Sequence, residues 1–213
     1  MTSKPTTTMR YFILSTLIFF SFLSKAQLFL PEFEKLRKLD VLNSSAEESM
    51  PIPYENGDKI FFVRTHVEGT LKQKSQGQEV YQSSRIDSVW LEPNNLFKRA
   101  NDKGNNAVIG SSFNGNRIYL FNSIQSHKKL ARGIGYIEKD SLGEWSKIKS
   151  IDIPNFQIGL GYYSFYMNQE EDILLVSMSP DENTIEEDLF VSLKDNEGNW
   201  SNLINLGSSI NTD

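Results

Sequence analysis

The sequence has 213 residues, no cysteine and a net charge of −5 at neutral pH, and its apolar fraction of 38% is sufficient for a sizeable core. Without cysteine, the chain forms no disulfide and no cysteine-ligated zinc site, and it has no thiol nucleophile. The acidic balance disfavours nucleic acid and anionic membrane faces as partners, because both carry negative charge themselves.

The first 26 residues have the features of an export signal. Lys4 and Arg10 form a positive start, and an apolar run of about 13 residues follows them. Small residues, Ser24 and Ala26, then occupy the positions that a signal peptidase reads. A helix that crosses a bilayer needs roughly 20 apolar residues, so the run is too short for a permanent anchor. We therefore predict cleavage after Ala26 and an exported protein, in the periplasm or associated with the outer membrane.

The mature chain is more acidic than the whole sequence. Cleavage removes three positive charges and no negative one, so the net charge goes from −5 to −8. Residues 27–48 are expected to form an N-terminal arm. Any helix is expected within Leu30–Leu42, where the apolar residues only roughly follow a helical stripe.

An internal repeat follows the arm. The only tryptophans, Trp90, Trp145 and Trp200, are spaced at intervals of 55 residues. The approach to the last two is also shared, because residues 140–146 and 195–201 both read Asp-x-x-Gly-x-Trp-Ser. The repeat predicts three units, at about 49–105, 106–160 and 161–213. Its structural positions are Trp90, Trp145, Trp200, Asp140, Asp195, Gly143 and Gly198.

Each unit contains signals for short strands joined by tight turns. Asn-Gly pairs at residues 56–57 and 114–115 lie between β-rich runs and indicate hairpins, because both residue types adopt positive φ readily. The third unit has the same layout, but its turn at residues 168–172 has no glycine. The predicted strands before each tryptophan cover residues 51–54, 59–63 and 79–83, then 111–113, 117–121 and 133–138, then 163–167, 173–176 and 188–192. The tryptophan is expected to open a fourth strand.

These units predict an all-β fold, a β-propeller-like array of about three four-stranded antiparallel blades. A β-sandwich would also produce frequent turns, but it gives no reason for the same Trp, Asp and Gly to recur at a constant interval. The first unit departs most from the pattern. Arg85 and Ser88 stand where the later units have Asp and Gly, and a polar insert from Thr65 to Gln78 is expected between its second and third strands.

The repeat resembles the TolB-type, WD-repeat-like β-propeller of exported proteins of the Bacteroidetes group. The resemblance covers about residues 49–213 and is tightest over 187–212, which include Asp-Leu-Phe-Val-Ser and Gly-Asn-Trp-Ser-Asn-Leu-Ile-Asn-Leu-Gly-Ser-Ser-Ile-Asn-Thr. Members of this family often carry the propeller ahead of a peptidoglycan-binding domain like that of outer-membrane protein A, which is not found here. Closed propellers have 4–8 blades. With three, the chain is expected to be a piece of a longer protein, or to associate through open blade edges.

The sequence predicts no catalytic, cofactor or metal site. His66 and His127 lie in separate polar segments without a spaced carboxylate partner, which is typical of surface histidine. The Asp140 and Asp195 turns are similar to the Asp-box of sialidases, but their glycine stands three residues after the Asp instead of two. Even a true Asp-box is a structural turn.

Two other groups of residues have a structural and a functional interpretation. The acidic clusters at residues 170–172, 181–182 and 186–188 could hold calcium, but they lack the alternation of a known loop, so a solvated rim is favoured. The aromatic side chains of Tyr162, Tyr163, Phe165 and Tyr166 could line a ligand surface. At strand spacing, filling of the gaps between blades is favoured.

The sequence supports three hypotheses for function. The first is a non-enzymatic exported propeller scaffold that mediates protein or glycan interaction in the cell envelope. The second is a carbohydrate-active, sialidase-like propeller enzyme. The third is the propeller half of a peptidase whose catalytic domain lies beyond residue 213. The first is preferred, because no spacing of carboxylates indicates a glycosidase pair.

Overall fold

The computed structural model describes residues 38–66, 77–95, 99–102, 105–126, 129–156, 163–179 and 186–212, and for residues 122–132 it describes the backbone alone. The chain divides into two units, Met1–Lys38 and Leu39–Asp213, and the description that follows concerns the second. In the described ranges, the longest helical element is a single short turn, and no helix could cross a membrane.

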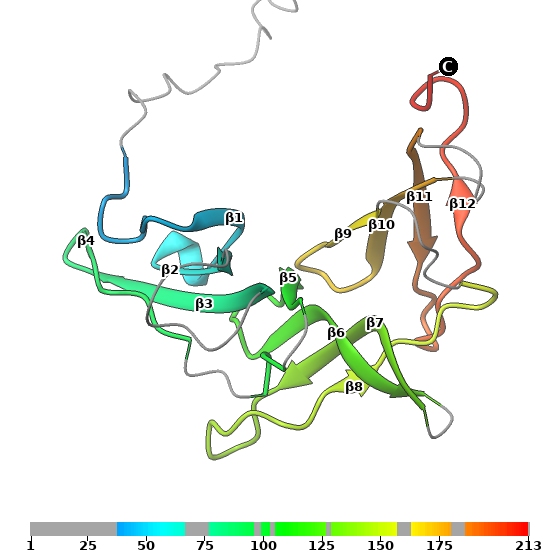
Figure 1. Cartoon of the computed structure of the whole chain (residues 1–213). Coiled ribbons are helices and arrows are strands. Elements are labelled where there is room, and N and C mark those ends of the chain that lie inside the picture. Colours follow the sequence, from blue (N-terminus) through cyan, green and yellow to red (C-terminus); the bar gives the residue numbers. More distant parts are fainter. Residues whose placement is uncertain are drawn as a thin grey trace, which may run out of the picture. The chain divides into compact units, whose positions relative to one another are not determined.

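The chain is all-β, and its strands form three four-stranded antiparallel sheets (Figure 1). Each sheet is a meander in which strands adjacent in sequence are hydrogen-bonded neighbours. Blade 1 contains β1 (Glu47–Tyr54), β2 (Lys59–His66), β3 (Gly77–Ile86) and β4 (Val89–Trp90). Blade 2 contains β5 (Ala107–Ser111), β6 (Arg117–Ser126), β7 (Lys129–Glu138) and β8 (Lys149–Ser150). Blade 3 contains β9 (Tyr163–Met167), β10 (Ile173–Met178), β11 (Asp188–Leu193) and β12 (Ile204–Asn205). The predicted incomplete propeller-like array is confirmed.

The first turn of each blade reverses the chain by left-handed backbone, as the Asn-Gly pairs predict. Gly115 has φ +65°, and the Asn114 side chain accepts a hydrogen bond from the Asn116 N–H at 3.0 Å. In blade 3, where the turn has no glycine, Glu171 takes the positive φ, +64°. Asn168 stabilises this strained turn, because its side-chain oxygen accepts from the N–H groups of Asp172 and Ile173.

A backbone hydrogen bond that recurs in all three blades shows which residues occupy equivalent positions. In each blade, the N–H at the end of the third strand donates to the carbonyl just before the second strand. The pairs are Arg85 to Asp58 at 2.6 Å, Lys139 to Asn116 at 2.8 Å and Lys194 to Asp172 at 2.9 Å. When the blades are aligned on this hydrogen bond, their strand pairs also match. The pairs Arg117–Glu138 and Tyr119–Tyr136 of blade 2 correspond to Ile173–Leu193 and Leu175–Val191 of blade 3.

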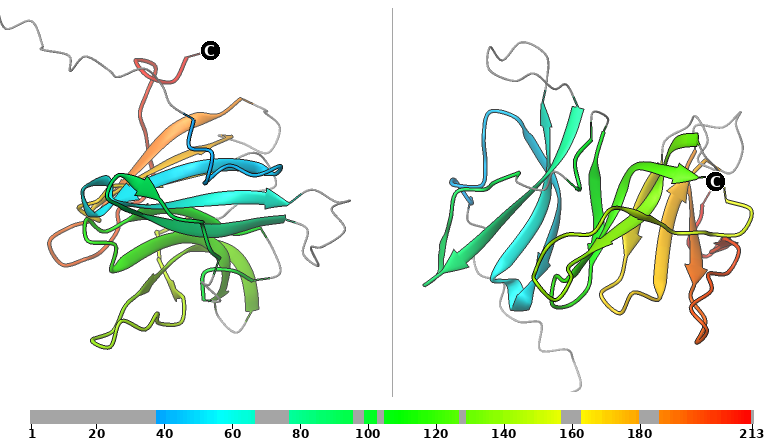
Figure 2. Two further views of the ribbon diagram at one scale, coloured as in Figure 1. Left: turned by 90° about the vertical axis from the view of Figure 1, so that its left-hand side faces the viewer. Right: turned by 90° about the horizontal axis from the view of Figure 1, so that it is seen from below.

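The first strands of the blades bring the sheets together, because β5 contacts both β1 and β9 (Figure 2). Two glycines permit the approach. A Cβ on Gly110 would lie 2.4 Å from the carbonyl oxygen of Met167, and one on Gly115 would lie 2.2 Å from the ring of Tyr54. The buried core includes the side chains of Tyr54, Phe61, Val63, Val80, Val108, Ile118, Leu120, Ile137, Met167, Leu174 and Val176.

Three expectations need correction. The helix expected within Leu30–Leu42 does not form over the described part, 38–42, which is a turn, and residues 30–37 lie outside the described range. The insert expected from Thr65 is shorter, because β2 continues to His66 and β3 begins at Gly77. The first strand of blade 2, expected at residues 111–113, is β5 and ends at Ser111.

Candidate functional site

The Asp-x-x-Gly-x-Trp-Ser segments form the same turn in blades 2 and 3. Asp140 Oδ1 accepts hydrogen bonds from the backbone N–H groups of Leu142 and Glu144, at 2.9 and 3.0 Å. Asp195 Oδ1 likewise accepts from the N–H groups two and four residues later, at 2.9 and 2.8 Å. These hydrogen bonds fix the backbone of each turn, so the two Asp side chains have a structural role.

The glycines of these turns are required for their backbone angle. Gly143 has φ +82° and Gly198 has φ +90°, values that L side chains adopt only with strain. A Cβ on either residue would meet no other atom within 4 Å. Because a side chain would fit at both positions, the positive φ angle is the reason that each turn has a glycine there.

Each tryptophan lies under a basic side chain that stands at the end of the third strand of its own blade or directly after it. The ring of Trp145 lies 5.0 Å from Lys139 Nζ, and the ring of Trp200 lies 5.6 Å from Lys194 Nζ. In blade 1, the guanidinium of Arg85 lies 5.7 Å from the Trp90 ring. Cation–π attraction of this kind ties the start of the last segment of each blade to its third strand.

The prediction that the tryptophan opens a fourth strand is wrong in detail. Trp90 is the second residue of the two-residue β4. Trp145 and Trp200 form isolated bridges with Lys139 and Lys194, and the strands β8 and β12 begin four residues after each tryptophan. The bridge closes the five-residue turn, and the later pairs Tyr136–Lys149 and Val191–Ile204 differ from the bridges in register by one residue, so the fourth strand begins only after this irregularity.

Blade 1 has a different turn at this place, as its sequence indicated. Asp87 and Ser88 both have positive φ, +49° and +67°, and they join the directly paired residues Ile86 and Val89. Two successive left-handed residues between paired strands are typical of a tight type I′ hairpin. The shorter turn needs neither the Asp nor the Gly of the later units.

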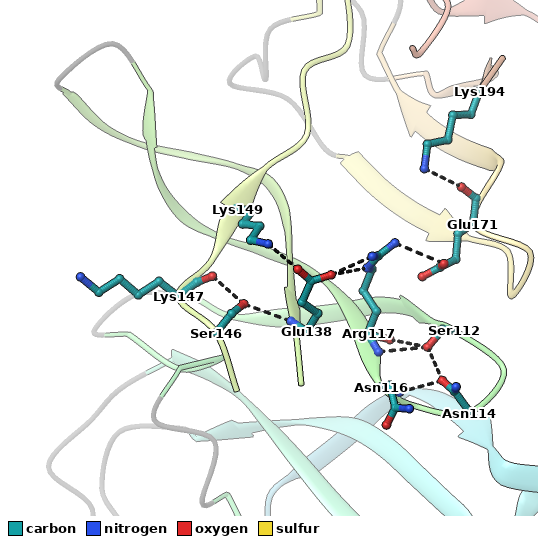
Figure 3. Close-up of polar contacts among 10 residues, drawn as sticks. All are labelled: Ser112, Asn114, Asn116, Arg117, Glu138, Ser146, Lys147, Lys149, Glu171 and Lys194. Carbon is teal, nitrogen blue, oxygen red and sulfur yellow. Dashed lines mark hydrogen bonds and ion pairs between the residues drawn. The ribbon is translucent and has the colours of Figure 1, made fainter. Parts of the chain in front are cut away.

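A charged cluster joins blade 2 to blade 3 (Figure 3). The Arg117 guanidinium on β6 donates to Glu138 Oε2 on β7 at 2.7 Å. The other terminal nitrogen of the guanidinium donates to Glu171 Oε2 in the first turn of blade 3, at 3.3 Å. Lys149 on β8 forms an ion pair with the second oxygen of Glu138, and its ammonium lies 5.7 Å from the Tyr136 ring.

Local hydrogen bonds position Arg117 and Glu138 for these contacts. Ser112 Oγ accepts from the Arg117 N–H at 3.0 Å and donates to Asn114 Oδ1, which fixes the β5–β6 turn. Ser146 Oγ accepts from the Glu138 N–H at 3.1 Å and donates to the Lys147 carbonyl. The serine of the repeated turn thus supports the strand residue that carries the cluster's central carboxylate.

The cluster also determines the protonation of its members. Hydrogen bonds from Lys149, and then from Arg117, lower the pKa of the Glu138 carboxyl. Burial lowers the pKa of the Arg117 guanidinium, but the hydrogen bonds to Glu138 and Tyr119 and the negative charge of Glu171 together outweigh it, so the pKa of Arg117 is raised. Burial beside the negative charge of Glu171 raises the pKa of the Tyr119 hydroxyl to about 12. Glu138 and Arg117 are therefore ionised at neutral pH.

Sequence reasoning missed this cluster and misjudged one member. In the acidic run 170–172, Glu170 and Asp172 are exposed, as a solvated rim requires. The Glu171 side chain is 22% exposed and pairs with Arg117, and its Oε1 has no hydrogen-bond partner among the described residues. The missing glycine in the turn at residues 168–172 was the available sequence signal, but the partner of Glu171, 54 residues away, could not be predicted from it.

The other predicted residues are placed as follows. Tyr163 and Phe165 pack against Phe121 of blade 2, with ring centroids 5.2 and 5.7 Å apart, which confirms that they fill the space between blades. Tyr166 is 49% exposed on the opposite face. Tyr162, His127, and residues 181–182 lie outside the described residues, as does the side chain of His66. Over the described ranges, no three His, Asp or Glu side chains gather as metal ligands would.

Comparison of the chain with models of known protein families gives no match, and a search among curated proteins gives none either.

Proposed function

We propose that the protein is a non-enzymatic, exported propeller-type scaffold that mediates protein or glycan interaction in the cell envelope. The observation that carries this proposal is the repeated turn of blades 2 and 3. Its backbone is fixed by the internal bonds of Asp140 and Asp195, and its remaining side chains face solvent, with Leu142 85% exposed. A rigid turn displayed on packed sheets suits recognition, because little conformational entropy is lost on binding.

The chemistry of the charged cluster supports a scaffold better than a hydrolase. A glycosidase needs one carboxyl group that stays protonated near neutral pH. Glu138 has the opposite character, because Lys149 and Arg117 lower the pKa of its carboxyl. Both carboxylates near Arg117 are engaged in ion pairs, Glu138 within blade 2 and Glu171 across the contact between blades 2 and 3.

The cell envelope as location is supported by the sequence. The N-terminal segment has the basic start, short apolar run and small residues of a cleaved export signal. The resemblance of residues 49–213 to TolB-type repeats favours the same address. A net charge of −8 after cleavage is compatible with protein or glycan ligands and disfavours nucleic acid.

A binding screen with matched variants tests the proposal. The exported protein is applied to a glycan array and to purified cell-wall and outer-membrane fractions, beside the variants Leu142→Ser and Leu189→Ser. Leu142 lies in the displayed turn, whereas Leu189 is an exposed leucine of the β11 strand. We expect saturable binding that Leu142→Ser weakens at least about tenfold and Leu189→Ser leaves unchanged.

An activity assay provides the opposing outcome. Fluorogenic sialosides and other glycosides are incubated with the same protein and with Glu138→Gln and Glu171→Gln variants. Turnover that either variant abolishes would show a glycosidase and would contradict the scaffold proposal. Binding that Leu142→Ser does not affect would remove the repeated turn as its basis.

A further inference from the structure

The face of blade 1 that points away from blade 2 is buried, although no blade precedes it in the described part of the chain. Phe62 of β2 and Tyr81 of β3 are directly paired, and their side chains are only 4% and 7% exposed. Successive strand residues point to opposite faces, and the neighbours of Phe62, Phe61 and Val63, belong to the core between the blades. Phe62 and Tyr81 therefore lie on the other side of the sheet, which we call the outer face of blade 1.

The position of Phe62 is covered by a preceding blade in blades 2 and 3. When the blades are aligned on their recurring hydrogen bond, Phe62 corresponds to Leu120 and Val176, which are both fully buried in the core between the blades. On the far side of blade 3, Leu193 and Ile204 are 46% and 50% exposed. A blade face without a neighbour thus leaves large apolar side chains open to solvent. Another segment must bury the outer face of blade 1.

The segment of residues 39–46, directly before β1, provides this cover, and we call it the end cap. Figure 2 shows it on the side of blade 1 that points away from blade 2. Leu42 is the buried leucine of the end cap, at 5% exposed, whereas Leu39 in the same segment is 39% exposed. Like Phe62 and Tyr81, Leu42 is buried without belonging to the core between the blades. The end cap therefore has a buried contact of its own.

The Arg64 guanidinium joins the end cap to the buried rings. It lies 4.4 Å from the centroid of the Tyr81 ring and 5.7 Å from that of Phe62. It also donates hydrogen bonds to the Leu42 carbonyl at 3.0 Å and to Glu48 Oε1 at 2.8 Å. The side chains of Arg64 and Glu48 are only 14% and 15% exposed. Hydrogen bonds between charged groups are strong where water is largely excluded, so Arg64 holds the end cap on the outer face.

Further hydrogen bonds fix the path of the end cap into β1. Glu48 Oε1 accepts from the Ser44 N–H at 3.1 Å and from Ser44 Oγ at 2.6 Å, and Ser44 Oγ accepts from the Ala46 N–H at 3.0 Å. Burial raises the pKa of the Glu48 carboxyl, but the hydrogen bonds from Ser44 and Arg64 outweigh it, so the pKa is lowered. Glu48 is therefore an anion at neutral pH and an effective partner for Arg64.

We propose that the end cap occupies the outer face of blade 1 in place of a preceding blade, and that it opens as a local unit when Arg64 loses its contacts. The hydrogen bonds of the end cap converge on Arg64 and Glu48, apart from the core between the blades, so the cap can open while that core stays packed. While it is closed, no sheet or apolar partner can reach Phe62 and Tyr81. When it opens, these rings form an apolar surface at the blade 1 end of the array.

Thiol labelling of the full chain tests the end cap. The chain has no cysteine, so Leu42→Cys, Leu39→Cys and Leu174→Cys each introduce a single thiol, and Leu174 reports opening of the core between the blades. We expect a maleimide to label Leu42→Cys at least about a hundredfold more slowly than Leu39→Cys. Adding Arg64→Ala should speed labelling at position 42 at least about tenfold and leave positions 39 and 174 unchanged. Arg99→Ala, at an exposed arginine, is the matched control and should change none of the rates.

Amide hydrogen exchange gives a second measurement that needs no cysteine. In the wild-type sequence, the N–H groups of Leu42 and Ser44 are hydrogen-bonded within the end cap and to Glu48. Arg64→Ala should speed their exchange at least about tenfold, without an effect on the Lys139 N–H of blade 2. Equal labelling of positions 42 and 39 would overturn the proposal. So would Arg64→Ala that has no effect on position 42, or that speeds labelling at position 174 or exchange of Lys139 as strongly.

Discussion

The α-carbon of Gly110 in β5 faces the backbone of Met167 in β9, so closely that a Cβ on Gly110 would lie 2.4 Å from the Met167 carbonyl oxygen. This approach brings the first strands of blades 2 and 3 into contact. Replacing Gly110 by Ala should therefore force the two strands apart, because backbone atoms cannot move aside as a flexible side chain can. We expect the free energy of unfolding to fall by about 3 kcal/mol.

Gly143→Ala is the comparison for this prediction, measured by denaturant unfolding of both variants. Gly143 has φ +82° and open space around its α-carbon, so alanine there introduces only backbone strain, about 1 kcal/mol. An effect of Gly110→Ala equal to or smaller than that of Gly143→Ala would show that the two strands do not approach as described.

The ion pair between Arg117 and Glu171 should stabilise the contact between blades 2 and 3. Glu171→Gln removes the charge and is expected to lower the free energy of unfolding by about 1 kcal/mol, because both side chains are largely shielded from solvent. Glu170→Gln is the matched control, since Glu170 is the exposed neighbour in the same turn. It should change stability by less than about 0.5 kcal/mol.

A double-mutant cycle separates the pair from general effects of substitution. The cycle combines Arg117→Gln with Glu171→Gln, and the coupling free energy should be favourable and about 0.5–1 kcal/mol. A coupling free energy indistinguishable from zero would mean that the effect of Glu171 on stability does not depend on its ion pair with Arg117.

The pH dependence of stability should show the role of Asp195 in its turn. Hydrogen bonds from the Asn199 N–H, and then from the other turn groups, lower the pKa of this carboxyl from its ordinary 3.8. A carboxyl with a lowered pKa in the folded state stabilises the protein above its unfolded-state pKa and ceases to do so as the pH falls through the folded value. Asp195→Ala should therefore lower the Tm at neutral pH, and its difference from the wild type should shrink below about pH 4.

A side-chain carbon NMR titration measures the same pKa directly. Its midpoint for Asp195 should lie below 3.8. Asp152→Ala, at an exposed carboxyl outside the turn, serves as the control and should show little change in Tm at any pH. A midpoint above 3.8, or a Tm difference that grows as the pH falls, would contradict the role given to the Asp195 carboxylate.

Export predicts a processed N-terminus. Intact mass spectrometry of secreted or periplasmic protein should find a chain that begins at Gln27, because Ser24 and Ala26 are the small residues next to the cleavage point. Ala26→Arg should block cleavage, and Lys25→Gln should not. A wild-type chain that retains Met1 in those fractions would rule out the signal.

The sequence predicted those parts of the fold that depend on local chemistry. The strand Tyr163–Met167 was predicted with its observed bounds, and Asn114-Gly115 marked the β5–β6 turn, because alternation and positive φ are local properties. The lysines stacked on Trp145 and Trp200 were not predicted, although each stands six residues before its tryptophan. No such local signal exists for the ion pairs of the charged cluster.

The contact between Arg117 and Glu171 could not be predicted, because it depends on the register of two sheets and on how blade 3 packs on blade 2. The start of the fourth strand was misjudged for a related reason. Trp145 pairs with Lys139 directly after the turn, but the pairs from Lys149 onward are out of register with this bridge by one residue, so the fourth strand begins only at Lys149. Both features are decided by three-dimensional packing, whereas the repeat itself is a property of the sequence.

The measurement that tests the account most directly is a nuclear Overhauser spectrum of the folded protein, with selectively labelled aromatic rings. Three successive blades that pack through equivalent faces predict contacts from Tyr54 to Gly115, between blades 1 and 2, and from Phe121 to Tyr163 and Phe165, between blades 2 and 3. The account predicts that both sets are present in one folded species. Intact cross-strand contacts within the sheets, without either inter-blade set, would contradict the propeller-like array.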